Sequence, residues 1–449
     1  MTRLNSKSKT ELLENFKGWI FEQIGSHDEI SIDLTSFKSK YFPVQNDIQI
    51  EIILISGTIN GSEEVFRKFL NFKDDNKSLF QLRKDDSAPS GQVNFFWPLG
   101  VIKTEDIPKV EFDTVSSQIF TSENGVYSVL DCYESDLLIR KLFESINLTF
   151  QLDDELATKD FVTIRRVTDS ADRCQIYVID SKFRICFYKY CVDSPNAGVD
   201  VLEKLGVSGF NHLAAPLARY MVGRNLVGLV IENFEAAITL EAMVNVSLRD
   251  LFDYRGDPTN AGADLSEEFR RLGEMLAKLH ILLEQKYHST PETSENLTEV
   301  CGLMIKRDAS KEAKSVKEDL KTIGSFEDFG LAIRIYNSLY LDIIYRTDMG
   351  WCLVDFGQDN FEIRVTPLVN IAQLLAQVKR VIDEQVSMQL ESDTQKITIL
   401  SNAWLKLNSE ALIDGYMEQI EAHDIVPRDR EVVNKIVTTA YRCLLAAAN

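Results

Sequence analysis

Residues 335–357 read IYNSLYLDIIYRTDMGWCLVDFG and carry the strongest chemical signal in the chain. Residues 339–344 are mainly apolar, residues 348–350 (Asp-Met-Gly) have the composition of a turn, and residues 351–356 are apolar apart from Asp355. This order predicts a strand, a tight turn and a second strand. An acid that ends a buried strand before a glycine is well placed to present its carboxylate to a metal–phosphate group. We therefore expect Asp355 to lie at a functional site.

The composition of the chain bounds the class of protein. A chain of 449 residues is too long for one ordinary domain, so two or three are expected. The 45% hydrophobic and 26% charged residues are typical of a soluble globular protein. A net charge of −20 argues against nucleic-acid and anionic-membrane surfaces, which need clustered Lys and Arg. A small phosphate ligand held in one local site is still compatible with this charge.

The cysteines and the N-terminal residues indicate in which cellular compartment the protein is expected. The seven cysteines are scattered and include no Cys-x-x-Cys pair, so neither a disulfide framework nor a zinc site is indicated. The first residues, MTRLNS, lack the apolar core of a signal peptide. No run approaches the roughly 18 apolar residues of a membrane span. A cytoplasmic protein is expected.

The order of strand and helix patterns predicts an α+β chain. Residues 9–24 have apolar positions at helical spacing, and alternating segments predict strands around residues 47–55 and 93–96. Residues 175–179 and 183–188 predict an antiparallel sheet, whereas residues 272–283, 369–381 and 432–445 have the apolar stripes of packed helices. Sheet before helices is an α+β order. We expect a mixed α/β part at 1–150, a second sheet-containing part at 151–240 and a helical part at 241–449.

Several short segments, in this order, resemble one family. The chain resembles the maltokinase branch of the aminoglycoside-phosphotransferase, kinase-fold family over about residues 150–445. The segments that carry the resemblance are FYKY (187–190), SPNA (194–197), GFNH (209–212), LVIENF (229–234), LGEMLAKLH (272–280), residues 336–344 at the place of the catalytic loop, and PLVNIA (367–372). No single segment is specific, and the ordered set carries the resemblance. The N-terminal part corresponds by position to the cap domain of that branch.

The resemblance implies a fold and a set of ligands. It implies a bilobal kinase-like fold, with a mixed antiparallel small lobe and a mainly helical large lobe after the cap domain. It implies ATP and Mg²⁺ as cofactors, with Asp355 as the metal ligand. The segment that contains Glu232 and Phe234 corresponds to the hinge whose backbone grips adenine. In such enzymes catalysis comes from positioning and from charge around the transferred phosphoryl group.

The chain departs from the family pattern at three of its four charged or metal-binding positions. Aligned on the resemblance, Ser338 stands at the catalytic Asp, Ile343 at the metal-binding Gln, and Cys186 at the phosphate-binding Lys. An apolar Ile cannot replace a Mg²⁺ ligand, because Mg²⁺ demands oxygen ligands. A neutral Cys cannot replace a Lys charge. Loss of a catalytic base alone costs roughly 10²–10⁴ in rate.

Two residues could compensate for these losses. Asp342, four residues after Ser338, is a candidate substitute acid, and the interpretation we favour is a solvated turn carboxylate. Lys189 is a candidate phosphate ligand, but in a regular strand it points to the face opposite Cys186, so surface exposure is favoured. His280 ends an apolar helical stripe, and we interpret it as a packing residue rather than an acid or base.

These observations lead to a functional hypothesis with two alternatives. We expect a catalytically impaired, kinase-like protein that acts by binding a sugar, a nucleotide or a partner protein of glucan or trehalose metabolism. The first alternative is an active, atypical ATP-dependent sugar kinase that forms a product such as maltose 1-phosphate. The second is an interaction scaffold whose acidic surface docks a basic partner. No nucleic-acid or membrane partner is expected.

Overall fold

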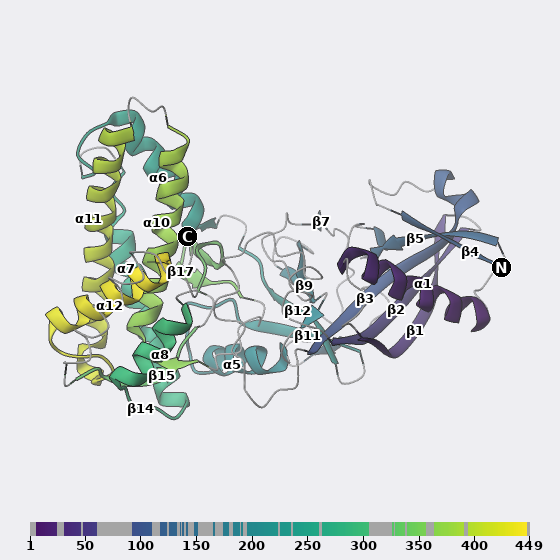
Figure 1. Ribbon diagram of the computed structural model, residues 1–449, viewed down its shortest axis with the longest axis horizontal. Coiled ribbons are helices and arrows are strands. Elements are labelled where there is room, and N and C mark those ends of the chain that lie inside the picture. Colours follow the sequence, from purple (N-terminus) through teal and green to yellow (C-terminus); the bar gives the residue numbers. More distant parts are fainter. Residues whose placement is uncertain are drawn as a thin grey trace. The chain divides into compact units, whose positions relative to one another are not determined.

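Strand-forming sequence precedes helix-forming sequence, and the computed structural model follows that order (Figure 1). The expected α+β class is confirmed: antiparallel sheets lie in the N-terminal part and helices dominate the C-terminal part. The structure describes residues 6–24, 31–45, 48–60, 92–109, 117–123, 125–132, 135, 137–138, 141, 148–150, 165–166, 174–178, 183–188, 190–191, 195–222, 225–234, 237–259, 263–304, 326, 328–336, 339–355, 363–389 and 394–446.

The chain divides into two compact units. The first comprises Met1–Lys73, Lys84–Asn196 and Pro216–Glu235, and the second comprises Asp74–Arg83, Ala197–Ala215 and Ala236–Asn449. Both six-stranded sheets lie in the first unit, and the long C-terminal helices lie in the second. The boundaries expected near residues 150 and 240 stay a prediction. No helix in the described part of the chain is long and apolar enough to cross a membrane.

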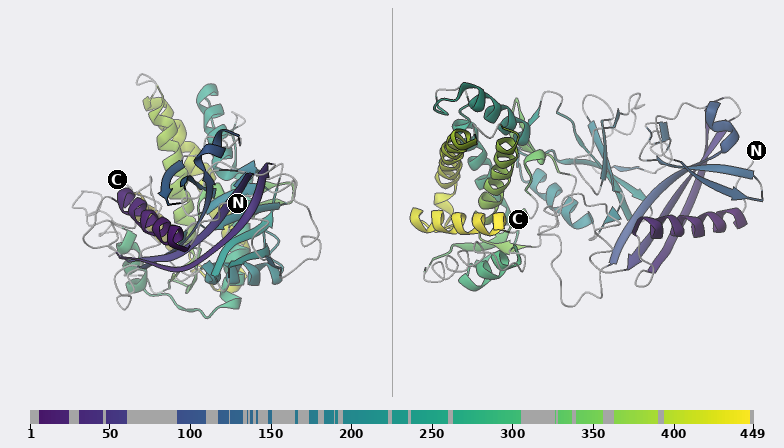
Figure 2. Two further views of the ribbon diagram at one scale, coloured as in Figure 1. Left: turned by 90° about the vertical axis from the view of Figure 1, so that its right-hand side faces the viewer. Right: turned by 45° about the horizontal axis from the view of Figure 1, so that its top comes forward.

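The first sheet is antiparallel and is covered by a helix. Its order is β1-β2-β3-β5-β4, and a short strand, β10, also pairs with β3. Helix α1 lies along one face of this sheet (Figure 2), with Leu12 and Phe16 buried one helical turn apart. The helix expected at residues 9–24 and the strands near 47–55 and 93–96 are thereby confirmed. The bounds are α1 (Ser6–Ile24), β1 (Ser31–Gln45), β2 (Ile48–Asn60), β3 (Gln92–Lys103), a 3-10 turn η1 (Thr104–Lys109), β4 (Ser117–Ser122), β5 (Gly125–Asp131) and β10 (Tyr190–Cys191).

The second sheet has the order β6-β11-β12-β9-β8-β7, and its pairs are antiparallel. The antiparallel pair expected at residues 175–179 and 183–188 is confirmed as β8 and β9. Cys186 lies in β9, where its backbone is opposite Ile176 and Leu229. The bounds are β6 (Leu148–Phe150), β7 (Arg165–Arg166), β8 (Cys174–Val178), β9 (Phe183–Tyr188), β11 (Pro216–Val222) and β12 (Asn225–Glu232).

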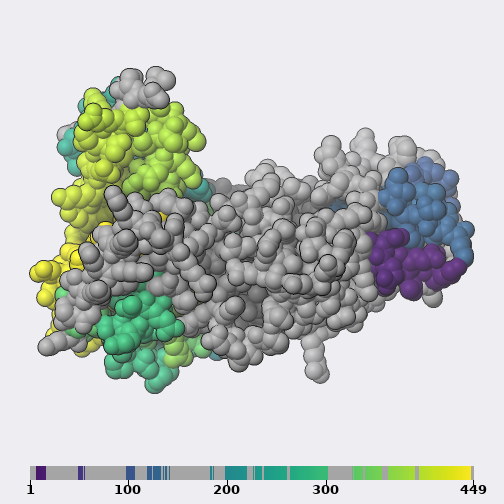
Figure 3. All heavy atoms as spheres, viewed as in Figure 1, coloured from purple at the N-terminus to yellow at the C-terminus, as the bar shows by residue number. Residues whose placement is uncertain are grey.

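Helices build the core of the second unit. Helix α7 packs along α11, and α10 packs against α6, α11 and α12 (Figure 1). In Figure 3 the ends of α10 and α11, coloured lime, form part of the surface of this unit. The apolar stripe expected on α7 is fully or almost fully buried. The helices are α5 (Pro195–Val207), α6 (Leu240–Tyr254), α7 (Ser266–Lys286), α8 (Ser294–Met304), α10 (Leu368–Ser387), α11 (Thr394–Ile420) and α12 (Arg430–Ala446), with a 3-10 turn η4 (Glu421–His423).

Two small sheets accompany these helices. One has the order β13-β16-β17 and the other β14-β15-β18. The tight turn expected at residues 348–350 is confirmed: Thr347 Oγ1 accepts from Met349 N (3.2 Å) and donates to Gly350 O (3.0 Å). Gly350 has φ +115°, a value that favours glycine. The bounds are β13 (Ile238–Thr239), β14 (Thr290–Pro291), β15 (Leu331–Arg334), a 3-10 turn η3 (Leu341–Ile343), β16 (Ile344–Thr347), β17 (Gly350–Leu353) and β18 (Arg364–Val365).

One detail of the expected hairpin is wrong. The apolar run 339–344 was expected to be the first strand, but that strand begins only at Ile344, and residues 341–343 form η3. The reason is that side chains of α10 take the backbone groups of Leu339 and Leu341 that a strand would use for its ladder.

Candidate functional site

The hairpin fixes the position of Asp355. Strand β16 pairs with β17 in a register that places Ile344 opposite Leu353, and the ladder continues as Val354 N donates to Ile343 O (2.8 Å). On the other edge of β17, Leu353 N donates to His212 O (2.8 Å) and Leu353 O accepts from Ala214 N (2.9 Å). Asp355 therefore follows a strand that is held on both edges, and it is buried, with 5% of its surface exposed.

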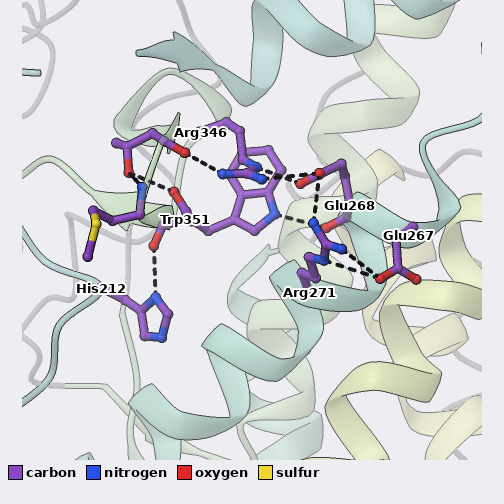
Figure 4. A network of polar contacts seen from close by, with 9 residues as sticks. His212, Glu267, Glu268, Arg271, Arg346 and Trp351 are labelled. Atoms are coloured by element: carbon purple, nitrogen blue, oxygen red, sulfur yellow. Dashed lines mark hydrogen bonds and ion pairs between the residues drawn. The ribbon is translucent and has the colours of Figure 1, made fainter. Parts of the chain in front are cut away.

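The opposite end of the hairpin is anchored to the start of α7 (Figure 4). Arg346 forms an ion pair with Glu268 (2.7 Å), and Trp351 Nε1 donates to the carbonyl oxygen of Glu268 (2.9 Å). His212 Nδ1 donates to Trp351 O (2.9 Å), and burial lowers the pKa of this imidazole. These contacts fix the tilt of the hairpin on the helical core, so the direction in which Asp355 leaves β17 is set from both ends.

Helix α10 holds the loop before the hairpin through two amide side chains. Asn370 Oδ1 accepts from Tyr336 N (3.2 Å), and Asn370 Nδ2 donates to Tyr336 O (2.6 Å). Gln377 Oε1 accepts from Leu341 N (3.1 Å), and Gln377 Nε2 donates to Leu339 O (2.6 Å). Asn370 and Gln377 are seven residues apart, so they project from the same face of the helix. Together they fix the backbone on both sides of residues 337–338.

The hydrogen bonds of Asn370 and Gln377 to the backbone before the hairpin form a clamp, and a buried histidine supports it. His280 is fully buried, with Nε2 3.0 Å from Asn370 Oδ1 and Nδ1 2.9 Å from the Tyr416 hydroxyl. Because Asn370 Oδ1 can only accept, Nε2 carries the proton and Nδ1 accepts from Tyr416. Burial lowers the pKa of His280 to about 4 and raises that of Tyr416. His280 is therefore neutral at pH 7, which agrees with its interpretation as a packing residue.

The structure places the expected site residues in different ways. Asp342 is half-buried in η3, directly before Ile343, whose carbonyl oxygen accepts from the N–H of Val354, the residue before Asp355. In the first unit, Cys186 is buried in β9, Glu232 is exposed at the end of β12, and Phe234 is half-buried. Ser338 and Lys189 lie outside the described residues. The roles assigned to all of these residues stay predictions.

The described residues offer a metal few ligands of their own. Within the described ranges, no group of three or more His, Cys, Asp or Glu side chains could hold a metal ion. Ile343 has only its backbone oxygen to offer, and that atom already accepts from Val354 N. Among the residues that the structure describes, Asp355 and Asp342 carry carboxylates near the end of the hairpin. This donor set fits Mg²⁺ only if nucleotide phosphates and water complete the octahedron, which is a common arrangement for this ion.

The roles of Asn370 and Gln377 were not predicted from the sequence. The available signal was two amides seven residues apart on a helix whose neighbouring positions are almost all apolar. Such polar residues on a buried face are rarely left without partners. That pattern predicts a backbone clamp, but it does not say which segment is held.

No family model matches the sequence. Among solved structures, the chain is similar to a glucosamine kinase in complex with glucosamine, ADP and inorganic phosphate, with 13% identity, 77% of this chain and 84% of that chain covered, and a TM-score of 0.47. A crystal form of glucosamine kinase is 12% identical over 91% of this chain and 87% of that chain, with a TM-score of 0.47.

An aminoglycoside phosphotransferase from Streptomyces rimosus is also similar in structure. It is 13% identical over 66% of this chain and 99% of its own, with a TM-score of 0.35. At these identities and TM-scores, the similarities leave the family of the chain undecided.

Proposed function

We propose that the chain is a kinase-like binding protein in which phosphoryl transfer is impaired. The proposal rests on a contrast between positioning and charge at one site. Hydrogen bonds hold Asp355's strand and the backbone on both sides of residues 337–338 in place, whereas Ile343, which is next to them, has no polar side chain. The geometry for positioning a loop is retained, but the charge that accelerates transfer is reduced. The sequence resemblance to sugar kinases supports the same interpretation.

Cys186 supports the proposal from the other unit. It is fully buried in β9 between neighbouring strands, where the resemblance places a phosphate-binding lysine. Burial among apolar residues suits a small neutral thiol. Introducing Lys there would place a charge in the sheet interior, so the site is built for a neutral side chain. The expected ligands are a nucleotide, a sugar or a partner protein of glucan or trehalose metabolism.

Asp355 is the residue we expect to retain a ligand. Bound Mg²⁺–ATP would supply a phosphoryl group already polarised by the metal. The carboxylate of Asp355 would bind the ion, and the clamp from α10 would keep the adjoining loop in place. Ile343 adds no oxygen ligand for the ion, so weak, Mg²⁺-dependent nucleotide binding without efficient transfer is expected.

Calorimetric titration of ATP, with and without Mg²⁺, tests the proposal. Wild type should bind ATP more tightly with Mg²⁺, and Asp355→Asn should abolish the Mg²⁺ effect. Asp348→Asn is the matched control, because Asp348 is an exposed carboxylate in the turn of the same hairpin. Binding of ATP should also raise the melting temperature by mass action. Rapid ATP-dependent phosphorylation of maltose or glucosamine, abolished by Asp355→Asn, would overturn the proposal.

A second candidate is an active, atypical sugar kinase. It is favoured by the hydrogen bond from Val354 N to Ile343 O, because Asp342 and Asp355 each adjoin one of these two residues, and two such carboxylates could divide the roles of base and metal ligand. Asp342→Asn should then lower kcat by roughly 10²–10⁴ and leave ATP affinity almost unchanged. Equal turnover in Asp342→Asn and wild type would exclude this candidate.

A further inference from the structure

Basic side chains gather around Tyr287, at the end of α7 in the second unit. The guanidinium carbon of Arg334, from β15, lies 4.5 Å from the centre of the Tyr287 ring. Lys204 Nζ, from α5, lies 5.6 Å from the same centre. Arg364, from β18, is directly opposite Arg334 in the antiparallel pair, and one of its terminal nitrogens donates to His288 O (2.9 Å). Two cations, Arg334 and Lys204, therefore lie against the Tyr287 ring, and a third, Arg364, lies on the strand paired with that of Arg334.

This cluster is electrostatically unusual for such an acidic chain. Like charges directly opposite on paired strands destabilise a sheet. The net charge of −20 means that acidic side chains outnumber basic ones. Within the described part of the chain, however, no carboxylate forms an ion pair with Arg334, Arg364 or Lys204. The repulsion among these three cations is therefore not offset by ion pairs with described residues.

The acidic side chains near the cluster do not accept hydrogen bonds from its three basic side chains. Glu292 accepts from the backbone N–H groups of Thr293 and Thr366 and from Asn296 Nδ2. Asp200 acts on Tyr287 through its charge: burial raises the pKa of the Tyr287 hydroxyl, Arg334 lowers it and Asp200 raises it. No described residue accepts a hydrogen bond from the side chain of Arg334. The positive charge of this guanidinium is therefore not neutralised by a hydrogen-bonded anion in the described part of the chain.

Arg334 is held in place by packing. Its Nε is buried and has no hydrogen-bond partner among the described residues, its guanidinium stacks on Tyr287, and the strand pair β15–β18 fixes its backbone. The two terminal nitrogens of Arg334 remain available for a ligand. Arg364 is likewise oriented by His288 O and keeps further donors. Orientation by stacking and by one hydrogen bond lowers the entropy that each side chain would lose on binding a ligand.

We propose that Arg334, Arg364 and Lys204 form a binding site for the phosphate group of a phosphomonoester. Guanidinium groups present parallel N–H donors that match the oxygens of phosphate or carboxylate. Three cations favour phosphate over carboxylate, because a phosphomonoester carries a charge of about −1.5 to −2 at pH 7. The site is separate from the proposed nucleotide role of Asp355 and does not depend on it.

Calorimetry on the full chain tests this site with inorganic phosphate and with glycerol 3-phosphate, at constant ionic strength. Wild type should bind both saturably. Arg334→Gln and Arg364→Gln should each weaken binding by about tenfold or more, because each removes charge-assisted hydrogen bonds. Lys204→Gln should weaken binding less, because an ammonium group does not present the paired N–H donors of a guanidinium group. Arg428→Gln is the matched control: Arg428 is exposed and paired with Asp424, and its loss should leave affinity unchanged.

Further variants and ligands keep the test decisive. Tyr287→Phe preserves the ring under Arg334 and should retain binding, whereas Tyr287→Leu removes the ring and should weaken it. Far-UV circular dichroism identifies any variant that fails to fold, and Arg364→Gln then carries the test, because the hydrogen bond from Arg364 to His288 O is exposed. Succinate that binds as tightly as phosphate would overturn the choice of phosphate. Absence of saturable phosphate binding, or an equal loss in Arg428→Gln, would overturn the site itself.

Discussion

At the scale of single residues, the interior of the second unit depends on one neutral histidine. His280 donates to Asn370 and accepts from Tyr416, and Asn370 in turn holds both backbone groups of Tyr336. A buried polar group costs stability unless its hydrogen bonds are made, and all members of this chain of contacts make them. Protonation of His280 would remove the acceptor that Tyr416 uses and would place a charge in the core.

This arrangement predicts a loss of stability in acid. In the folded chain the pKa of His280 is lowered to about 4, below the ordinary value of 6.5, so the unfolded chain binds the proton first. The contribution of neutral His280 is therefore complete above pH 6.5 and declines as pH falls towards about 4. Over that window it amounts to roughly 3 kcal/mol of the free energy of unfolding.

The measurement is urea unfolding of wild type and His280→Gln at several pH values from 7.5 to about 4. The variant should be less stable at pH 7.5 but should lose less stability across the window. His423→Gln is the control, since His423 is exposed. Parallel stability curves for wild type and His280→Gln would show that His280 does not titrate as described.

Residue patterns predicted some of the site and missed the rest for a physical reason. The place of Asp355 after a buried strand was predicted, because a continuous apolar run and a glycine turn are local signals. The clamp was not, because the partners Asn370 and Tyr336 are 34 positions apart, and Gln377 and Leu339 are 38 apart. The residues adjacent in the sequence do not show whether an Asn or Gln side chain binds a distant backbone segment or is solvated. The same long-range bonds turned residues 341–343 into η3 rather than strand.

At the scale of elements, two helices approach so closely that only glycine fits. Gly273 of α7 faces the backbone of α11, and a Cβ built there would overlap the carbonyl oxygen of Leu412. Gly415 of α11 faces α7 in the same way, and its Cβ would overlap the carbonyl oxygen of Arg270. Reciprocal glycines bring the two backbones together and allow the packing of Phe269 edge-on against Trp404.

Gly273→Ala should therefore destabilise the second unit, although Ala is the better helix former. The gain in helix propensity is about 1 kcal/mol. Forcing two backbones apart costs more than the usual 1–3 kcal/mol of overpacking, since a carbonyl cannot rotate away as a side chain does. We expect a net loss of about 2 kcal/mol or more in urea unfolding. Gly206→Ala in α5 is the control, because its Cβ would meet only the Ala215 methyl, at 3.0 Å. Equal effects of the two substitutions would contradict this account.

Helix and strand patterns fixed most element types but not which elements belong together. Residues 197–215 lie between strands in the sequence, yet they belong to the second unit. Val201, Leu202 and Leu205 of α5 join the core of the C-terminal helices, and Leu213 bridges to Leu353. The apolar positions of α5 predict a helix, but they do not show that it joins the core of the C-terminal helices, which are distant in the sequence.

At the scale of the whole molecule, charge is distributed unevenly. The chain has 69 acidic and 49 basic residues, yet Arg334, Arg364 and Lys204 gather without ion pairs to described carboxylates. A net negative field repels phosphates at long range, and salt screens it beyond about 10 Å at 0.1 M. Local positive charge can still bind an anion at short range, so raising salt should weaken a phosphate complex less than it would for a uniformly basic surface.

The division into two units also predicts how the molecule unfolds. Each unit has its own buried core, so each is expected to unfold as a cooperative body. The four tryptophans are divided evenly: Trp19 and Trp97 belong to the first unit, and Trp351 and Trp404 to the second. A chain with Trp19→Phe and Trp97→Phe therefore reports by fluorescence on the second unit alone.

In that background, Gly273→Ala should lower the urea midpoint of the fluorescence transition. A destabilising substitution in the first unit should leave the urea midpoint of the fluorescence transition almost unchanged. Glu51→Gln is such a substitution, because Glu51 is buried and paired with Lys9 at 2.8 Å. Far-UV circular dichroism, which sees both units, should then show a broader transition than fluorescence. If both substitutions moved the fluorescence midpoint equally, the two units would unfold as one cooperative body, and the expectation of separate unfolding would be wrong.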